Sequence, residues 1–589
     1  MIHPFRPAAR TRRGGGRKND PRGRDGRVSA DPQSFLKTQV DGAAAACRQG
    51  WQVLRERGPS QVQFWFIALA IGIAAGFAAL FFRKGITWLQ TTLYGVEDIR
   101  ELHSFAEGLP WWLILIIPIC GGLVVGLILH HFTPDGRVRS VADVIEGAAL
   151  AEGRVEHRAG LASALASMIT LGSGGSSGRE GPVVHLAAVI SSKVSAWIKA
   201  DGITGRDLLG CAVAAAVSAS FNAPIAGAIF ALEVVLRHFA VHAFAPIVIA
   251  SVAGTVINRL EFGDVTEFSL TQGGALAFYV ELPAFLILGL LSGLIAVAFM
   301  RATFWAEDLG NLLQRLTGIP RWLRPAIAGA LLGGMAIYFP IIIGVGYETT
   351  SDALTGNLLL REAIVFAILK TAAAAITIAG RMGGGVFSPS LMIGALSGLA
   401  FGLIATAIFP EVSGSETLYA LAGMGAVAAA VLGAPISTTL IVFELTGDWQ
   451  TGLAVMVAVS LSTALASRLV DRSFFLTQLE RRNIHLAAGP QAYLLAMFRV
   501  SNVMRPMDHE TAAPQEQLLT LIEQGIYLDT HATLERALPV FERTGLDYVP
   551  VVTLAPGDAP PALEGALFHV DALKAYNRAL AATAAEEHS

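Results

Sequence analysis

The segment Gly172-Ser-Gly-Gly-Ser-Ser-Gly-Arg-Glu-Gly-Pro182 is followed by a largely apolar run, Val183 to Ile190. Glycines permit tight turns and close approach of a ligand. Pro182 is tolerated in the first turn of a helix because its missing N–H would have no partner there. The segment therefore predicts a glycine loop that leads into a helix N-terminus. The unpaired N–H groups and the positive dipole end of such a start attract anions.

A second copy of this construction lies about 210 residues further along the chain, at Gly385-Val-Phe-Ser-Pro389. A second pair of matching segments occurs in the same order and at nearly the same separation: Ala223-Pro224-Ile225 and Ala434-Pro435-Ile436. Paired broken segments in two halves of a chain are typical of the central site of a transporter. The pattern predicts two duplicated halves whose helix starts point at one anion site. Tight helix packing by small residues is the alternative reading of both loops.

Composition places the chain in a membrane. Of its 589 residues 53% are hydrophobic and 15% are charged, and the mean hydropathy is +0.54. About 20 apolar residues suffice to cross a bilayer. The first long uncharged run lies too far from the start of the chain to be a signal peptide. The long uncharged runs are Pro59 to Phe82, Trp111 to Leu129, Leu208 to Leu232, Leu282 to Met300, Pro325 to Tyr347, Met382 to Pro410 and Thr417 to Phe443.

Three regions are predicted. Residues 1–60 form a basic, Gly-rich tail, in which residues 1–30 carry nine Lys and Arg against two Asp, and the positive-inside rule places it in the cytoplasm. The tail lacks interleaved aromatic residues, which favours a disordered tail over a nucleic-acid-binding arm. Residues 61–480 are the apolar body, and residues 481–589 a polar α/β unit. Cys47, Cys120 and Cys211 lack metal or redox spacing, so no metal site is predicted.

Glu180 lies inside the first glycine element, where a carboxylate is costly unless something compensates for its charge. The helix dipole is able to do so. An ionised Glu180 then occupies the site of a permeating anion, and a protonated Glu180 leaves it, which makes this residue a candidate gate and proton carrier. The alternative is a capping carboxylate paired with Arg179. A phosphate-binding loop is disfavoured, because no Lys-Ser or Lys-Thr follows the glycines.

At these motifs the sequence closely resembles the CLC family of chloride channels and chloride/proton antiporters, over about residues 60–480. The resemblance implies an all-α polytopic membrane protein of about eighteen helices in two inverted repeats, about 61–265 and 275–480. It implies a homodimer with one pore in each subunit and chloride as the bound ion. Glu180 corresponds to the gating glutamate, and the anion contacts are implied at Gly178, Arg179, Gly181 and the backbone N–H groups of Val386 and Phe387.

Three positions depart from the family pattern. Ser140, in Arg139-Ser-Val-Ala-Asp143, falls at the anion-binding serine but lacks the usual flanking glycines and proline. Phe475 stands where a pore tyrosine is expected, so a hydroxyl donor is missing. Val234 replaces the internal proton glutamate of the antiporters, whereas its neighbour Glu233 recurs at a repeat-matched position as Glu444, which favours a structural role for both.

The valine favours channel-like conduction of chloride. The first alternative is a chloride/proton antiporter with a non-standard internal proton route through water, Glu233 or His238. An alternative of another class is a cation-coupled transporter of an organic solute, which would need clustered oxygen ligands. No enzyme motif is present, so no catalytic activity and no cofactor are predicted.

The C-terminal region is similar to a CBS domain at Thr544-Gly545 before Val549 to Val552, at Asp571-Ala-Leu573 and at Val500 to Met504. The resemblance implies either adenine nucleotide binding or a dimer-stabilising or regulatory module without a ligand. A helix from Leu534 and strands at Val549 to Val552 and Gly565 to Val570 are expected. We expect a multi-pass protein of the inner (plasma) membrane with both termini in the cytoplasm.

Overall fold

The computed structural model describes residues 60–96, 101–239, 241–263, 268, 278–484, 486, 495, 498–554 and 561–587. The tail predicted for residues 1–60 lies outside the described residues apart from Ser60, and so does Cys47. Ser60 begins the first described helix: its hydroxyl accepts the N–H of Gln63, and the Gln63 side chain accepts the N–H of Ser60. This reciprocal capping satisfies two N–H groups that a helix start leaves open.

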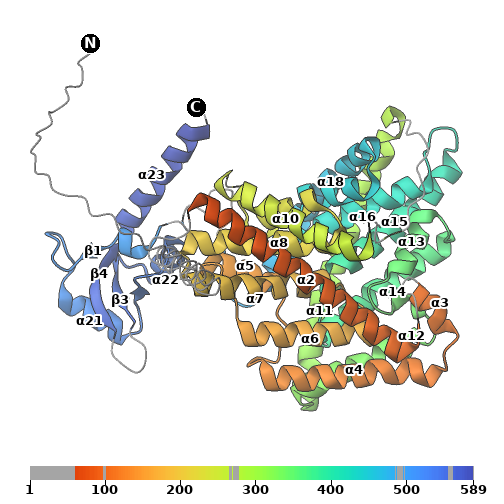
Figure 1. The fold of residues 1–589 in the computed structure, drawn as a ribbon, viewed down its shortest axis with the longest axis horizontal. Coiled ribbons are helices and arrows are strands. Elements are labelled where there is room, and N and C mark those ends of the chain that lie inside the picture. The colour runs from red at the N-terminus through yellow and green to blue at the C-terminus, as the bar shows by residue number, and fades with distance from the viewer. Residues whose placement is uncertain are drawn as a thin grey trace, which may run out of the picture. The chain divides into compact units, whose positions relative to one another are not determined.

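The body is helical, as predicted (Figure 1). Eight of its described helices are long and apolar enough to cross a membrane. The described part of residues 61–480 contains eighteen α-helices, and these are α2 (Gln61–Tyr94), α3 (Leu102–Glu107), α4 (Trp111–Phe132), α5 (Val141–Leu150), α6 (His157–Gly172), α7 (Glu180–Ile198), α8 (Gly202–Phe221), α9 (Pro224–Phe230), α10 (Val241–Phe262), α11 (Phe278–Thr317), α12 (Arg324–Ala336), α13 (Tyr347–Thr355), α14 (Leu360–Ala379), α15 (Phe387–Ile408), α16 (Glu416–Leu432), α17 (Pro435–Thr446), α18 (Trp449–Leu469) and α19 (Phe474–Glu480).

Small residues let these helices approach closely. A Cβ added to Gly72 of α2 would meet the backbone of Ala250 in α10 at 2.6 Å. The corresponding pair in the second half is α11 and α18, where a Cβ on Gly289 would meet the carbonyl oxygen of Ala458 at 2.7 Å. Within a bilayer the hydrophobic effect does not drive helices together, because lipid tails are as apolar as the side chains. Close van der Waals contact between backbones of this kind holds membrane helices together instead. Glycine therefore allows the close packing of these two helix pairs.

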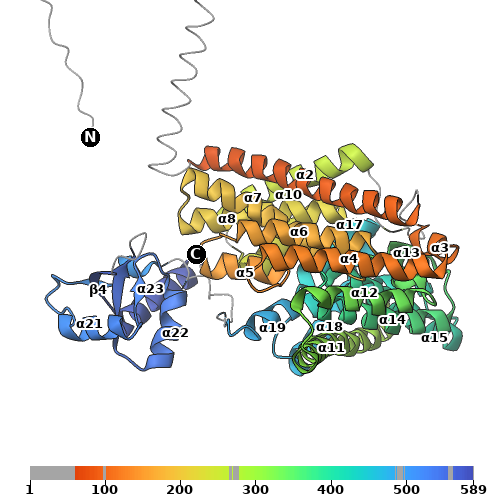
Figure 2. The same cartoon turned by 90° about the horizontal axis from the view of Figure 1, so that it is seen from below.

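The two halves are inverted copies, as the resemblance implies. Helices α4 and α12 run antiparallel, because Gly122 lies against Pro325 and Gly333 lies against Leu115. The packing of α7 on α8, α8 on α10 and α2 on α10 recurs as α15 on α16, α16 on α18 and α11 on α18. In Figures 1 and 2, α2 lies along α10 and α8, on the outside of the first half.

Glu233 and Glu444 exchange caps between the halves. The Glu444 carboxylate accepts the N–H groups of Ile225 (2.9 Å) and Ala226 (2.7 Å) at the start of α9. The Glu233 carboxylate accepts the N–H groups of Ile436 (2.9 Å) and Ser437 (2.8 Å) at the start of α17. A carboxylate stabilises a helix N-terminus through its open N–H groups and its dipole. The repeat-matched glutamates therefore have the structural position that the sequence favours.

Replacing Glu444 by alanine should destabilise the protein by roughly 1–3 kcal/mol, because two N–H groups of α9 lose their acceptor. The melting temperature in detergent should fall, and Glu444→Gln, which keeps one acceptor oxygen, should cost less. Glu411→Ala is the matched control, since Glu411 is exposed. A melting temperature of Glu444→Ala equal to that of the control would contradict the capping role.

The C-terminal region contains a four-stranded sheet in the order β1-β4-β3-β2, from β1 (Arg505–Pro506), β2 (Leu528–Asp529), β3 (Tyr548–Thr553) and β4 (Ala562–Phe568). Strands β3 and β4 are antiparallel, and β2 pairs parallel with β3. Helices α21 (Gln515–Glu523), α22 (Leu534–Thr544) and α23 (His569–Glu587) accompany the sheet. The small α/β unit is thus present. The expected extent of its second strand is wrong, because β4 ends at Phe568 and α23 begins at the next residue.

Candidate functional site

The two glycine elements meet, as predicted. The N–H of Gly178 donates to the carbonyl oxygen of Gly385 at 2.7 Å, and the N–H of Gly385 donates to the carbonyl oxygen of Gly178 at 2.7 Å. Helices α7 and α15 begin two residues after these glycines. Gly181 belongs to the same contact, because a Cβ on Gly385 would lie 3.2 Å from its nitrogen. Two helix N-termini, one from each half, therefore face one region, and together they favour negative charge there.

The Glu180 carboxylate lies at this junction. It is the first residue of α7 and is 3% exposed. Its Oε1 atom accepts the Ser388 hydroxyl of α15 at 2.6 Å. Its Oε2 atom has no hydrogen-bond partner among the described residues. The side chain thus reaches from one helix start to the other and occupies the region that both helix dipoles make attractive to an anion.

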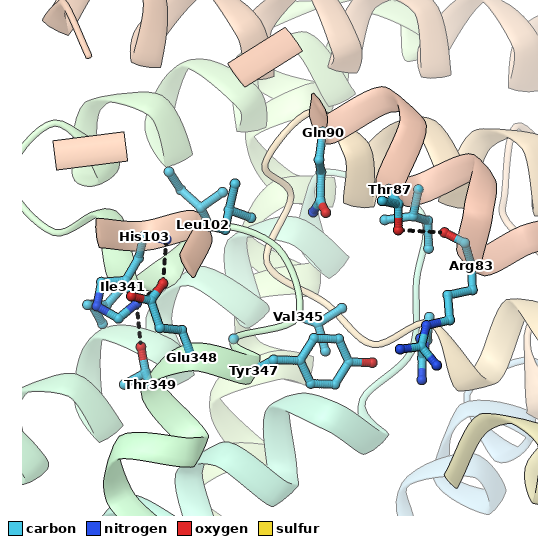
Figure 3. A pocket seen from close by; sticks show the side chains of 14 residues that line it. Arg83, Thr87, Gln90, Leu102, His103, Ile341, Val345, Tyr347, Glu348 and Thr349 are labelled. Atoms are coloured by element: carbon cyan, nitrogen blue, oxygen red, sulfur yellow. Dashed lines mark hydrogen bonds and ion pairs between the residues drawn. The ribbon is translucent and has the colours of Figure 1, made fainter. Parts of the chain in front are cut away.

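The Arg179 side chain contacts Ser220 and Tyr347. Its guanidinium donates to the carbonyl oxygen of Ser220 at 2.9 Å and lies 5.2 Å from the Tyr347 ring centroid. Arg179 also lines a cavity that we name the Tyr347 cavity (Figure 3). Its polar and charged lining comes from α2, α3, α13 and the α7 start, and comprises Arg83, Thr87, Gln90, His103, Arg179, Tyr347, Glu348 and Thr349.

Glu348 joins α3 to α13 at the wall of the Tyr347 cavity. It accepts the backbone N–H of His103 at 2.8 Å, the Ser104 hydroxyl, and the His103 ring at 3.0 Å. Burial by itself would raise the pKa of Glu348, but the hydrogen bonds from His103 and Ser104 outweigh burial and lower this pKa. A carboxyl whose pKa is lowered in the folded state stabilises the fold above its unfolded pKa of about 4.3, and loses that effect as the pH falls through the folded pKa.

Replacing Glu348 by glutamine should therefore lower the free energy of unfolding on the order of 1 kcal/mol at pH 7. The difference from the wild type should shrink once the pH falls below about 4, where the wild-type carboxyl is itself protonated. Thermal unfolding followed from pH 7.5 to 3.5 measures both. Glu107→Gln, an exposed position on the same helix α3, is the control. A stability difference independent of pH would contradict this account.

A second cavity, which we name the Phe475 cavity, brings together three of the four remaining predicted anion contacts, whereas the Phe387 ring packs against Phe221 and Phe230. Ser140, Val386 and Phe475 all line it, as does Gly385. Phe475 is the second residue of α19 and is buried. The backbone of Val386 lies just before α15, so its N–H belongs to the open start of that helix. The phenyl ring leaves an aromatic wall here without a hydroxyl donor.

The two cavities lie at opposite ends of α4. The Tyr347 cavity is lined by residues of α3, which precedes α4, and the Phe475 cavity is lined by Arg137 and Val138, which follow it. A helix of 22 residues is about 33 Å long. The Gly178–Gly385 contact belongs to both surroundings, since Arg179 lines the first cavity and Gly385 the second. Residues of the Gly178–Gly385 contact and its neighbour Arg179 thus border both cavities.

Asp143 is a functional candidate that the sequence reasoning missed. Its Oδ2 atom accepts the N–H of Ser140 at 2.7 Å and lies 3.4 Å from the Ser140 hydroxyl. Its Oδ1 atom accepts Arg137 at 3.1 Å and Arg482 at 3.0 Å. The Ser140 amide and hydroxyl thus face a carboxylate of their own helix start. The only sequence signal was a Ser followed three residues later by an acidic residue, which is typical of a helix cap.

Val234 is buried in a short π-helix, Ala231–Leu236, that continues α9. Its neighbour Glu233 is held as a cap on α17. Burial lowers the pKa of His238 to about 4. The sequence left three internal proton routes open: water, Glu233 and His238. The Glu233 carboxylate accepts backbone N–H groups of α17. The lowered pKa of His238 disfavours this residue as a proton acceptor near neutral pH.

Comparison with known proteins identifies relatives of this chain. The family described as "Voltage gated chloride channel" matches residues 121–467. A putative chloride channel protein ClcB-like from Ralstonia nicotianae is 31% identical, over 67% of this chain and 91% of its own length. The voltage-gated ClC-type chloride channel ClcB of Escherichia coli K12 is 29% identical, over 69% of this chain and 97% of its own length.

Solved structures share the fold. A slow cyanobacterial Cl⁻/H⁺ antiporter superposes with a TM-score of 0.64 at 22% identity, over 72% of this chain and 98% of the antiporter. A CLC-type fluoride/proton antiporter superposes with a TM-score of 0.57 at 20% identity, over 69% of this chain and 95% of its own. The family match covers more than half of the chain, and the inverted helical fold with paired helix starts agrees with it. The chain therefore belongs to the CLC family of voltage-gated chloride channels and their relatives.

Proposed function

We propose that this membrane protein conducts chloride between the Phe475 and Tyr347 cavities, with Glu180 as the gate and with channel-like rather than proton-coupled conduction. The observation that carries the proposal is the position of the Glu180 carboxylate on two helix N-termini, held by Ser388 at 2.6 Å. When ionised, the carboxylate takes the place of the anion. When protonated, it loses its attraction to the helix dipoles and the anion is able to enter.

The anion contacts follow from the same geometry. The N–H groups of Val386 and Phe387 at the α15 start, and that of Gly181 beside Glu180, supply donors without a fixed cation. The N–H of Gly178, also predicted as an anion contact, donates to the Gly385 carbonyl oxygen instead. Ser140 adds a donor from the Phe475 cavity. Phe475 supplies the positive edge of an aromatic ring in place of a hydroxyl. Arg179 acts from the Tyr347 cavity, where its charge attracts anions towards the gate.

A chloride/proton antiporter is the second candidate. Two of the solved structures with this fold are described as proton-coupled antiporters, one for Cl⁻ and one for fluoride. Against this stands Val234, a side chain without a titratable group at the position of the internal proton glutamate.

Simultaneous measurement of chloride and proton fluxes tests the proposal. Purified full-length protein in liposomes should release chloride under a chloride gradient with a shunted membrane potential. Channel-like conduction predicts no uphill proton movement driven by that gradient. Proton uptake in fixed ratio to chloride efflux would instead establish the antiporter. Absence of chloride efflux would remove both.

Asp143 provides a further prediction on the Phe475 side. Asp143→Asn keeps an acceptor oxygen for the Ser140 N–H but removes the negative charge beside it. If that charge opposes an anion at Ser140 by about 1 kcal/mol, chloride should bind about fivefold more tightly in the variant. Titration of flux against chloride concentration on both sides measures this. Asp448→Asn, which neutralises a capping aspartate of α18, is the control, and tighter binding in both variants would contradict a local effect.

We further propose that the protein forms a homodimer in the inner membrane with both termini in the cytoplasm. Apolar side chains are exposed on α10, α17 and α18, including Val252, Val256, Ile436 and Met456, and they fit a partner subunit or lipid.

Adenine nucleotide binding by the C-terminal sheet stays a prediction. Calorimetric titration of the full-length protein with ATP tests it.

A further inference from the structure

A third cavity reaches α7 beyond the gate, and we name it the His185 cavity. It is lined mainly by ionisable side chains from the α4–α5 connection, α5, the segment after α5 and the segment after α19, and these include Asp135, Arg137, Arg139, Asp143, Glu146 and Glu156. It shares Arg137 and Arg482 with the Phe475 cavity. Arg482 follows the last helix of the membrane body, so both cavities lie on the side where we propose that the C-terminal region lies, the cytoplasm.

His185 is the one residue of α7 on the wall of this cavity. It follows Glu180 by five residues, which places the two backbone positions about 7.5 Å apart along the helix axis. The imidazole is 2% exposed. Its ring packs over Gly160 of α6, where an added Cβ would lie 2.7 Å from Cε1 and 3.0 Å from Nδ1. Glycine at this position therefore makes room for the ring.

Neither ring nitrogen of His185 has a hydrogen-bond partner among the described residues. A neutral imidazole carries one N–H donor and one acceptor nitrogen, and leaving such groups buried without partners costs about 1–3 kcal/mol each. Buried polar side chains are retained in membrane proteins where they serve a pathway for ions or protons. A histidine that touches a polar cavity on one side and lies one and a half turns from the gate has the position of a proton carrier.

The charges around the imidazole are balanced. Arg139 pairs with Glu156 at 2.8 Å and with Asp135 at 2.8 Å, and both charges of the first pair act on His185. Asp143 joins Arg137 and Arg482. Glu146 of α5 is the remaining acidic group on the wall, and Arg154 the remaining basic one. On α6, His157 is bonded to Ser192 at 3.1 Å and is followed by Arg158. Of the two charges that act on His185, Arg139 opposes a proton on the ring and Glu156 favours one.

We propose that His185 carries protons between the water of the His185 cavity and the Glu180 carboxylate. The inference rests on the proposed gating role of Glu180. One ring nitrogen accepts a proton from hydronium in the cavity, which leaves water. The imidazolium then gives up a proton through one or two waters to Oε2 of Glu180, the carboxylate oxygen without a partner. Glu180 becomes a neutral acid, and His185 returns to the neutral imidazole. The histidine thereby makes the Glu180 gate responsive to the pH of the His185 cavity.

His185→Gln tests the proposal, because glutamine keeps polarity and approximate size but does not titrate. His157→Gln is the matched control. The first readout is chloride current in inside-out patches from cells that express the full-length protein, with the bath pH stepped from 7.5 to 5.5. The second is proton uptake by liposomes driven by a chloride gradient.

We expect the chloride currents of the wild type and of His157→Gln to respond to cytoplasmic acidification to the same extent. His185→Gln should lose at least fivefold of that response, with chloride flux at pH 7.5 within twofold of the wild type. Its response to acid on the opposite side should persist, because that side reaches Glu180 through the Tyr347 cavity. Gly160→Ala, which presses on the ring without removing it, should show a smaller loss and covers the case in which His185→Gln does not fold.

A full response in His185→Gln would overturn the proposal. The proposal would also be overturned if the wild type neither responds to cytoplasmic pH nor moves protons. If Glu180→Gln still changes chloride flux in that case, the gating role of Glu180 stands and only the histidine carrier fails. If Glu180→Gln leaves chloride flux unchanged, the proposed gate itself fails, and the role of His185 fails with it.

Discussion

Chloride efflux from liposomes should rise about tenfold or more when Glu180 is replaced by alanine or glutamine, and it should lose its dependence on pH. The ionised carboxylate holds the anion site through Ser388 and two helix dipoles. A charge-assisted hydrogen bond contributes about 1.5–3 kcal/mol, and each 1.4 kcal/mol corresponds to a factor of ten in occupancy. Removing the carboxylate charge removes this competition with chloride.

Ser388→Ala is the graded control for the gate. It removes one hydrogen bond to Glu180 but leaves the carboxylate and both helix starts in place, so efflux should rise by a smaller factor and stay dependent on pH. Glu411→Ala, at an exposed position, should behave as the wild type. Unchanged efflux in both Glu180 variants would remove the gate assignment. A smaller effect in Glu180→Ala than in Ser388→Ala would be equally damaging.

Replacing Gly384 by alanine should abolish chloride transport and strongly destabilise the protein. Gly384 has φ +120, a conformation that L side chains rarely adopt, and a Cβ would lie 1.9 Å from the Ser177 hydroxyl oxygen. Strain at such a backbone position and forced repacking each cost about 1–3 kcal/mol. The displaced segment includes the Gly178–Gly385 contact, so the two helix starts would separate.

Gly334→Ala is the matched control, because a Cβ on this α12 glycine meets nothing within 4 Å. Alanine is a better helix former than glycine by up to about 1 kcal/mol, so this variant should be at least as stable as the wild type and should transport chloride normally. Melting temperature and liposome efflux are measured for both variants. Wild-type efflux from Gly384→Ala would show that the close contact of the two loops is not required.

Much of the fold and part of the site follow from local sequence. The hydrophobic runs indicated the membrane body, because length and apolarity alone decide whether a helix crosses a bilayer. The Gly-x-x-x-Pro elements indicated both helix starts, because glycine and proline act on their own turn of chain. The duplication then predicted that Gly178 and Gly385 meet, which the 2.7 Å hydrogen bonds between them confirm.

Other parts of the site join residues that local sequence does not connect. Asp143 binds Arg482 across 339 positions of the chain, and no local pattern indicates that pair. Glu233 and Glu444 were recognised as repeat-matched, but their exchange of caps depends on how α9 and α17 pack against each other. Arg179 was predicted as an anion contact, and that stays a prediction; its contacts with Ser220 and Tyr347 depend on packing that no local pattern indicates.

The sequence by itself determined that the chain is a duplicated membrane protein with anion-attracting helix starts, because apolar length, glycine and proline act through the nearest turns of backbone. Only the tertiary structure decided which hydroxyl donates to Glu180, which carboxylate faces Ser140, and that the His185 imidazole, without a partner among the described residues, borders a polar cavity. Those relations depend on distances between helices far apart in the chain. Such distances are set by the packing of all the helices together.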